Sequence, residues 1–221
     1  MSRRMVGAGF FGKVTSHGDF VARRLAPSFQ RPWDEWLQGG LRESRVALGE
    51  TWLATYMSSP IWRFALAPGV CGDQGWAGLM MPSVDRVGRH FPLTIAATVT
   101  PPLACLMRHE AWFNRIEALA LASLREDFSL DALDFDLCAL GVPDSPDAPA
   151  PSGAVIAFDG RQPDLHALAN AALQGRSLWW TDGSPRVAPC LVVCAGLPEP
   201  AAFTALLDGD WQAHGWGVNA G

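Results

Sequence analysis

Three short stretches of the sequence place polar side chains where they could do chemistry. The first, GAGFFGKVT at residues 7–15, contains the opening positions of a phosphate-binding loop, G-x-x-x-x-G-K. The residue after Lys13 is Val14, however, where such a loop needs a serine or threonine to hold magnesium. The preceding MSRRMV is too short and too basic to be the strand that leads into the loop. We therefore expect no ATP or GTP binding and no cofactor here.

The second stretch, SHGDF at residues 16–20, pairs a histidine with an aspartate. Together these side chains could act as a general base and the group that orients it. The chain contains no G-x-S-x-G nucleophile elbow, which would supply a serine for them to activate. Serine, histidine and aspartate in loops commonly satisfy nearby backbone amides instead. The structural interpretation is favoured for this stretch.

The third stretch, at residues 81–93, sets five polar side chains around a glycine and between two apolar runs: Ser83, Asp85, Arg86, Arg89 and His90. Arginines beside a hydroxyl and a carboxylate could bind a phosphate or an acidic group of a partner. The alternative is an internal network that braces a turn. Gly88 permits a tight turn with a positive φ, in which Asp85 neutralises one arginine and the second stays available to a partner.

Metal and disulfide chemistry find little support in the sequence. The histidines are scattered without the spacing of a zinc motif: His17, His90, His109, His166 and His214. The five cysteines are odd in number and form no C-x-x-C pair. Two of them, Cys190 and Cys194, sit in the apolar run PCLVVCAGL, where cysteine behaves as a small hydrophobic residue. We expect neither a metal site nor disulfides.

Composition limits the classes of protein that the chain can belong to. Its 221 residues suit one large domain or one domain with a subdomain, and 49% hydrophobic residues provide a sizeable core. A net charge of −5 without a basic stripe argues against nucleic-acid binding and against attachment to an anionic membrane surface. No apolar run is long enough for a membrane span, and the N-terminus lacks a signal-peptide core. We expect a cytoplasmic protein.

Periodicity predicts helices and antiparallel strands in the first part of the chain. Residues 1–15 suggest an extended segment and 18–29 a loop or a short helix. Pro32 suits the first position of a helix, followed at helical spacing by Trp33, Trp36, Leu37 and Leu41. The pair Gly39 and Gly40 is predicted to divide this helix from a second one that continues to Tyr56. Strands are predicted over 61–67, 76–84 and 91–100.

The second part of the chain alternates helices and strands. A broad apolar stripe predicts a helix over 103–128, and the proline-rich residues 143–152 are either a surface loop or a boundary between two lobes. Beyond them we predict strands over 153–159 and 177–182 and a buried strand over 188–196, with a helix over 164–175 and a short helix over 199–210. The whole predicts an α/β (α+β) fold: a mixed, partly antiparallel central sheet flanked by helices, an α/β/α sandwich in a single domain over 1–221.

Ten tryptophans against one tyrosine are unusual for a chain of this length. Most such rings are expected in the core, because a large ring is usually well buried. Tryptophan and arginine are also common anchors of protein interfaces, so we expect one or two rings to contact a partner. The candidate partner-binding residues are Trp33, Trp36, Asp85, Arg86, Arg89 and His90.

Several separated motifs resemble one known family. FFGKVTSHGDFVARRL, PWDEWLQGGL, YMSSPIWRF and WAGLMMPSVDRVGRHFPLTIAATV, over roughly residues 7–100, are similar to those of the TagF (ImpM) accessory proteins of bacterial type VI secretion systems. SLWWTDG at 177–183 extends the resemblance into the second half. The resemblance implies no nucleophile, metal or cofactor. It implies post-translational repression of secretion through binding of the forkhead-associated (FHA) scaffold protein of the system.

Two alternatives stay open beside a regulatory binding protein. A structural adaptor of the secretion apparatus would need only a surface, as a regulator does, and the sequence does not separate the two. A small hydrolase or phosphate-transfer enzyme would be built on Lys13, Asp19, Asp85 and His90. A deep pocket that holds several of these four side chains would favour the enzyme, and an exposed patch centred on arginine or tryptophan would favour a binding protein.

Overall fold

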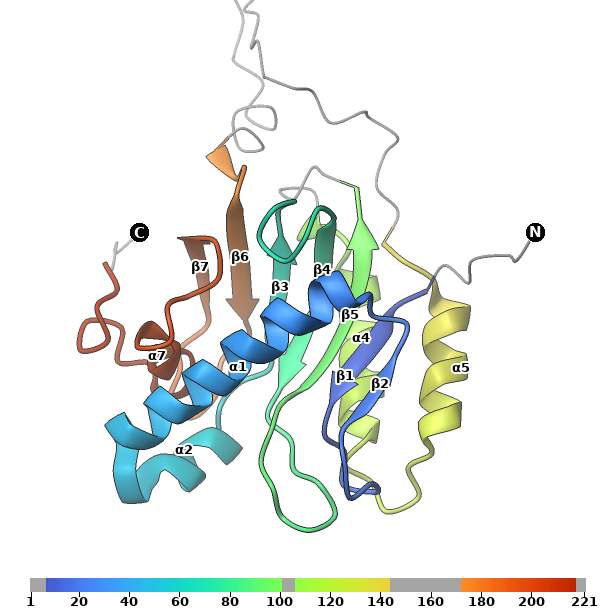
Figure 1. The fold of residues 1–221 in the computed structure, drawn as a ribbon, viewed down its shortest axis with the longest axis horizontal. Coiled ribbons are helices and arrows are strands. Elements are labelled where there is room, and N and C mark those ends of the chain that lie inside the picture. Colours follow the sequence, from blue (N-terminus) through green and yellow to red (C-terminus); the bar gives the residue numbers. More distant parts are fainter. Residues whose placement is uncertain (1–6, 101–105, 144–171, 218–221) are drawn as a thin grey trace, which may run out of the picture.

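The computed structural model describes residues 7–100, 106–143 and 172–217, and its frame is a single β-sheet. The strands pair in the order β2-β1-β5-β4-β3-β6-β7, and every neighbouring pair is antiparallel. Their bounds are β1 Gly9–Gly12, β2 Val21–Arg23, β3 Trp62–Leu66, β4 Gly75–Met81, β5 Leu93–Val99, β6 Arg176–Thr181 and β7 Cys190–Ala195. Helices cover both faces of the sheet, as predicted for an α/β/α sandwich (Figure 1).

The two faces of the sheet are covered by different parts of the chain (Figure 1). On one face lie α1 (Pro27–Leu48), η1 (Gly49–Thr51), α2 (Trp52–Met57), η2 (Ala202–Thr204) and α7 (Ala205–Asp208). On the other face lies α4 (Glu110–Ala122), and α5 (Leu130–Leu140) packs beside it. The strands between them are apolar on both sides, which explains why β3, β4 and β5 are near-continuous hydrophobic runs in the sequence.

The face under α1 is an aromatic core. Six buried tryptophans belong to it, Trp33, Trp36, Trp52, Trp62, Trp76 and Trp179. The Trp33 indole donates to Thr94 Oγ1 at 2.9 Å, and the Trp36 indole donates to the Pro198 carbonyl at 2.7 Å. A buried indole needs such a partner for its N–H. Trp33 and Trp36 are therefore core residues, and the expectation that they contact a partner is wrong because both rings are buried.

Helix α1 differs from its prediction at its start and at its middle. It begins at Pro27, which occupies the N1 position after the extended Ala26, so Pro32 lies inside the helix. It also runs unbroken through Gly39 and Gly40. A Cβ at position 40 would lie 2.4 Å from the ring of Phe203, so this glycine is where the helix and η2 approach closely. Tertiary packing outweighs the low helix propensity of glycine here.

Several other elements differ from expectation. Of the helix predicted over 103–128, the described residues contain α4, which begins only at Glu110 after a turn, and α5 is a separate helix that begins after Ser129, whose hydroxyl accepts from the Ala132 N–H. Residues 18–29 contain the short strand β2. Among the described strands, β7 lies at the edge of the sheet with half-exposed Leu191 and Val193, which differs from the buried strand predicted there. The strands predicted over 61–67, 76–84, 91–100 and 177–182 are confirmed, as are the short helical turns within 199–210.

Other predictions cannot be compared with the structure. The strand over 153–159, most of the helix over 164–175 and most of the stretch 143–152 lie outside the described residues. Among the residues that are described, no helix is both long and apolar enough to span a bilayer.

Candidate partner-binding site

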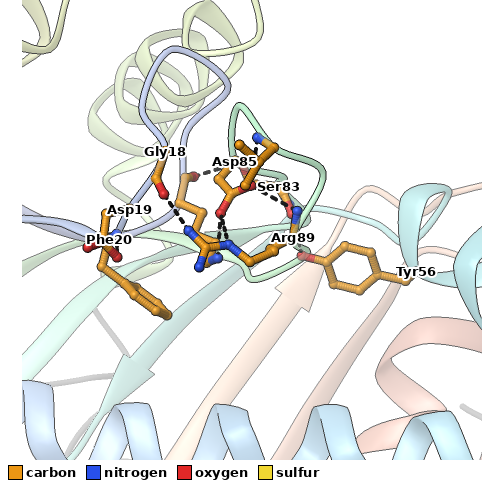
Figure 2. A network of polar contacts seen from close by, with 9 residues as sticks. Gly18, Asp19, Phe20, Tyr56, Ser83, Asp85 and Arg89 are labelled. Carbon is orange, nitrogen blue, oxygen red and sulfur yellow. Dashed lines mark hydrogen bonds and ion pairs between the residues drawn. The ribbon is translucent and has the colours of Figure 1, made fainter.

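Two loops meet at one end of the sheet and form what we call the loop surface, residues 16–20 and 85–90. The first loop joins β1 to β2, and the second joins β4 to β5. The Arg86 backbone N–H donates to the His17 carbonyl at 2.9 Å. The Arg89 guanidinium donates to the Gly18 carbonyl, as Figure 2 shows. These contacts hold two segments together that lie about seventy positions apart in the sequence.

A buried carboxylate organises the second loop. Asp85 Oδ1 accepts from the Val87 N–H at 3.0 Å and from the Arg89 N–H at 2.8 Å. Gly88 takes a φ of +85°, the left-handed conformation predicted for this position. The turn is therefore built around the Asp85 side chain, which has no exposed surface.

Two cations share the same carboxylate (Figure 2). Lys13 Nζ lies 2.6 Å from Asp85 Oδ2, and Arg89 Nε lies 2.7 Å from it. Burial opposes ionisation of Asp85, but the hydrogen bonds from Lys13, Arg89 and Val87 outweigh it and hold the pKa of the carboxyl below its usual range. The predicted pairing of Asp85 with one arginine is confirmed, and Lys13 is a second partner that sequence spacing does not predict.

Ser83 and Tyr56 continue the network into the core. Ser83 Oγ donates to the Lys13 carbonyl at 2.7 Å, which ties the two loops once more. The Tyr56 hydroxyl donates to the Ser83 carbonyl and accepts from the Ser83 N–H, each at 2.9 Å. Burial raises the pKa of Tyr56 above its usual value, so the phenol stays protonated. The loop surface is thus anchored to α2 through one tyrosine.

The outer side of the loops carries exposed cationic and apolar groups. Arg86 and Val87 are exposed at the turn, and the Arg89 side chain is 57% exposed although its Nε is bound to Asp85. The Arg86 guanidinium lies over Gly18, since a Cβ at position 18 would be 3.5 Å from its Nη2. Phe20 is 45% exposed and stacks on Phe11 of β1. This combination can bind an anionic group that is flanked by an apolar side chain.

His90 lies at the inner side of the turn. Its ring meets the rings of Trp52 and Tyr56 edge-to-face, with centroids 5.7 Å apart in each pair. Burial and the nearby positive charge of Arg45 lower the pKa of His90. Val84 and His90 also form a β-bridge across the base of the turn. The residue supports the turn and faces aromatic side chains.

The four residues of the enzyme hypothesis do not form one reaction centre in the structure. Lys13 and Asp85 are paired and buried, and the low pKa of Asp85 keeps it from donating or accepting a proton near neutrality. Asp19 is exposed and accepts from the N–H of the next residue, Phe20, while His90 faces Trp52 and Tyr56. A groove of ≈ 750 Å³ and a small cavity of ≈ 10 Å³ are both lined by other residues.

The lysine of the phosphate-loop motif also has a different setting from the one that nucleotide binding requires. Residues 9–12 form strand β1, and the chain then turns into β2 instead of entering a helix. A phosphate loop needs a helix N-terminus at that point. Among the described residues, no group of three or more histidine, cysteine, aspartate or glutamate side chains is placed to hold a metal ion.

Sequence reasoning missed several members of the site. The sequence does not single out Phe20 or Val87, because a single exposed apolar residue is ordinary in a loop. The periodicity places Tyr56 on a helix face, four residues after Trp52, and its contact with Ser83 is visible only in the structure. The sequence places Lys13 in a motif similar to a phosphate loop and among the four candidate enzyme residues, and no local pattern predicts its pairing with Asp85.

The fold and the site define an α/β/α protein with an antiparallel sheet and a braced loop surface at one end. The family model of the TagF N-terminal domain, type VI secretion system-associated, matches residues 9–140, which is more than half of the chain. The chain therefore belongs to the TagF family of type VI secretion system-associated proteins. The crystal structure of PA0076 from Pseudomonas aeruginosa PAO1 is similar, with 37% identity and a TM-score of 0.86 over 97% of this chain and 98% of that chain. No curated protein matches the chain.

Proposed function

We propose that this protein represses its type VI secretion system after translation by binding the FHA scaffold protein of that system. Membership of the TagF family supports a role in type VI secretion. The observation that carries the proposal of a binding role is the Lys13–Asp85–Arg89 network, which fixes two distant loops side by side and leaves Arg86 outside. An ordered surface of this kind suits recognition, because little conformational entropy is lost when the partner binds.

The loop surface has the composition of an interface centre. Arg86 and the outer N–H groups of Arg89 provide charge-assisted donors, and Val87 and Phe20 provide apolar contact area. Two cations share the single buried carboxylate, so positive charge remains to attract an acidic segment of the scaffold. In this proposal Arg86 and Arg89 contact the partner, while Asp85 and His90 hold the turn in shape. The site of action is the cytoplasm, where we expect the scaffold to be found.

Direct binding measurements test the contact. The purified FHA scaffold protein is titrated with this chain and with Arg86→Glu, and Arg31→Glu serves as a control of equal charge change. Arg31 is exposed on α1 and is not part of the loop surface. We expect Arg86→Glu to abolish measurable binding and Arg31→Glu to retain it. Equal binding by both variants would exclude the loop surface as the contact.

Genetics separates a repressor from a structural adaptor. Deletion of the gene raises the secretion of a marker effector if the protein represses the apparatus, and lowers it if the apparatus needs the protein for assembly. Complementation with Arg86→Glu is expected to leave secretion raised, while Arg31→Glu restores repression. Loss of secretion in the deletion strain would reject the repressor and favour the adaptor.

A further inference from the structure

A groove of ≈ 750 Å³ lies on the molecule apart from the loop surface. One wall is the face of α1 that carries Glu43, Val46 and Ala47, in the last turns of the helix. The other wall is formed by the end of β7, residues 197–202 and the turn 213–216. None of the residues of the loop surface lines it.

The walls of the groove are held in place by tryptophans. The Trp36 indole donates to the Pro198 carbonyl at 2.7 Å, and the Trp216 indole donates to the Ala202 carbonyl at 2.9 Å. Trp216 also meets Trp211 edge-to-face, and Trp211 meets the buried Trp62 in the same way. A groove with fixed walls is preformed, so a ligand does not have to order them.

Small apolar side chains dominate the lining. Val46 is 78% exposed near the end of α1, and alanines, Leu197, Pro198 and Trp216 also line the groove. Thr204 also lines the groove, and its buried Oγ1 has no hydrogen-bond partner within the described part of the chain. The valine, the alanines and Trp216 thus give the groove apolar surface that no other part of the described chain covers.

The charge of the lining has one sign. Its described residues include Glu43 and Glu199 and no lysine or arginine, although the chain has sixteen arginines. Among the described residues, Glu43 forms an ion pair only with its neighbour Arg42, at 3.9 Å, and Glu199 forms none. His214 is occupied by Asp208, 2.9 Å from its Nε2. The apolar walls can contact an apolar side chain of a ligand, and the carboxylates of Glu43 and Glu199 can pair with lysine or arginine beside that side chain.

From these observations we propose that the groove binds a segment of a partner protein in which apolar side chains are flanked by lysine or arginine. The segment lays its apolar side chains between Val46 and Trp216, and its cations meet Glu43 and Glu199. This ligand is opposite in charge to the acidic segment proposed for the loop surface. The two surfaces therefore select different segments, and the groove proposal does not depend on the loop surface.

A pair of peptides tests the chemistry of the occupant. Both are twelve residues long with leucines at the same positions, and the polar positions are all lysine in one and all glutamate in the other. Each is titrated into the isotope-labelled full chain and followed by amide chemical shifts. We expect the lysine peptide to shift amides of residues 43–47 and 197–202, and the glutamate peptide to bind at least about tenfold more weakly. Equal binding of the two peptides, no binding, or shifts confined to other regions overturns the proposal.

Matched variants test the location. Ala47→Trp fills the groove from an exposed position, and Ala54→Trp places the same ring on exposed α2 outside it. Glu43→Lys reverses a charge of the lining, and Glu35→Lys makes the same change elsewhere on α1. We expect Ala47→Trp and Glu43→Lys to weaken binding of the lysine peptide about tenfold, and both controls to leave it unchanged. Equal effects of variant and control, or self-association of the chain that Ala47→Trp removes, would show that the occupant is not the one proposed.

Discussion

At the scale of single residues, Arg86 and Arg89 of the loop surface have different structural roles. Arg89 donates to the Asp85 carboxylate and to the Gly18 carbonyl, so part of its side chain holds the two loops together. The contact found for Arg86 within the loops is made by its backbone, and its exposed guanidinium lies over Gly18. The same residue type thus braces the site at one position and faces solvent at another, three residues away.

This difference predicts different outcomes for the two alanine variants. Arg86→Ala is expected to weaken binding of the FHA scaffold about thirtyfold, because a charge-assisted contact at an interface centre is lost, with the unfolding midpoint unchanged. Arg89→Ala is expected to lower both the affinity and the unfolding midpoint, because the turn loses a brace. Titration calorimetry and thermal melts of the same samples measure the two effects. A lowered midpoint for Arg86→Ala with normal binding would mean that its side chain is structural.

The ionisation of Asp85 predicts a dependence of stability on pH. The pKa of Asp85 is held below its ordinary value of 3.8, so the folded chain binds the proton less readily than the unfolded chain does. Its contribution to stability is complete above that ordinary value and is lost as the pH falls from there toward the lower folded-state pKa. We expect Asp85→Asn to be clearly less stable than the wild type at pH 7, and the difference to shrink below about pH 4. Melting temperatures from pH 7 to pH 3 measure it, and a difference that stays constant contradicts the assignment.

The residue types of the site were predictable, but their roles were only partly so. The turn at Gly88 and the pairing of Asp85 with an arginine follow from sequence spacing alone. The approach of Lys13 to Asp85 does not, because the two residues are separated by 72 positions and are brought together only by the pairing of β1 with β5 and of β5 with β4. The sequence also does not show that Trp33 and Trp36 lie in the core, because tryptophan suits an interface and a core equally well.

At the scale of elements, α1 shows how packing decides where a helix runs. The sequence pattern predicts a break at Gly39 and Gly40, yet the helix is continuous and η2 packs against it. The separate helix α5 was predictable, since Ser129 is a good N-cap and Leu130, Leu133 and Leu137 follow at helical spacing. Strand β2 is only three residues long and is positioned by its pairing with β1, so no local sequence pattern predicts it.

The two glycines of α1 provide a matched pair of mutations. A Cβ at position 39 would lie 3.5 Å from Pro200, an ordinary contact, whereas at position 40 it would lie 2.4 Å from the Phe203 ring. Gly39→Ala is expected to stabilise the protein by about 0.5–1 kcal/mol through helix propensity. Gly40→Ala is expected to destabilise it by about 1–3 kcal/mol, because overpacking displaces the ring. Urea unfolding of both variants measures the difference, and stabilisation by Gly40→Ala would show that η2 moves freely away from α1.

At the scale of the whole molecule, the sheet contains strands from both the N-terminal and the C-terminal part of the described chain. Strand β6, from the C-terminal part, pairs with the central strand β3. The Trp62 indole of β3 donates to the Leu206 carbonyl, and Trp36 of α1 donates to the Pro198 carbonyl. The family model ends at residue 140, whereas the aromatic core under α1 includes Trp179 and Phe203. We therefore propose that the described residues fold as one unit.

A truncated chain tests this unity. The fragment 1–143 retains the whole match to the family model but lacks β6, β7, η2 and α7. We expect it to aggregate or to unfold without a cooperative transition, because β3 becomes an edge strand and the aromatic side chains under α1 lose their cover. The full chain serves as the control and is expected to unfold in one transition. A soluble fragment with its own sharp transition would show two independent units.

The burial of Lys13 has a practical consequence for labelling the protein. It is the only lysine of the chain, and its side chain is 6% exposed and bound to Asp85. Reagents that acylate ε-amines therefore have no accessible lysine on the folded protein, and neither do enzymes that acetylate or conjugate lysine. Acylation of Lys13 becomes a marker of unfolding, because the amine reacts only when the Lys13–Asp85 pair has opened. The mass shift from acylation of Lys13 would then report how often this end of the sheet unfolds.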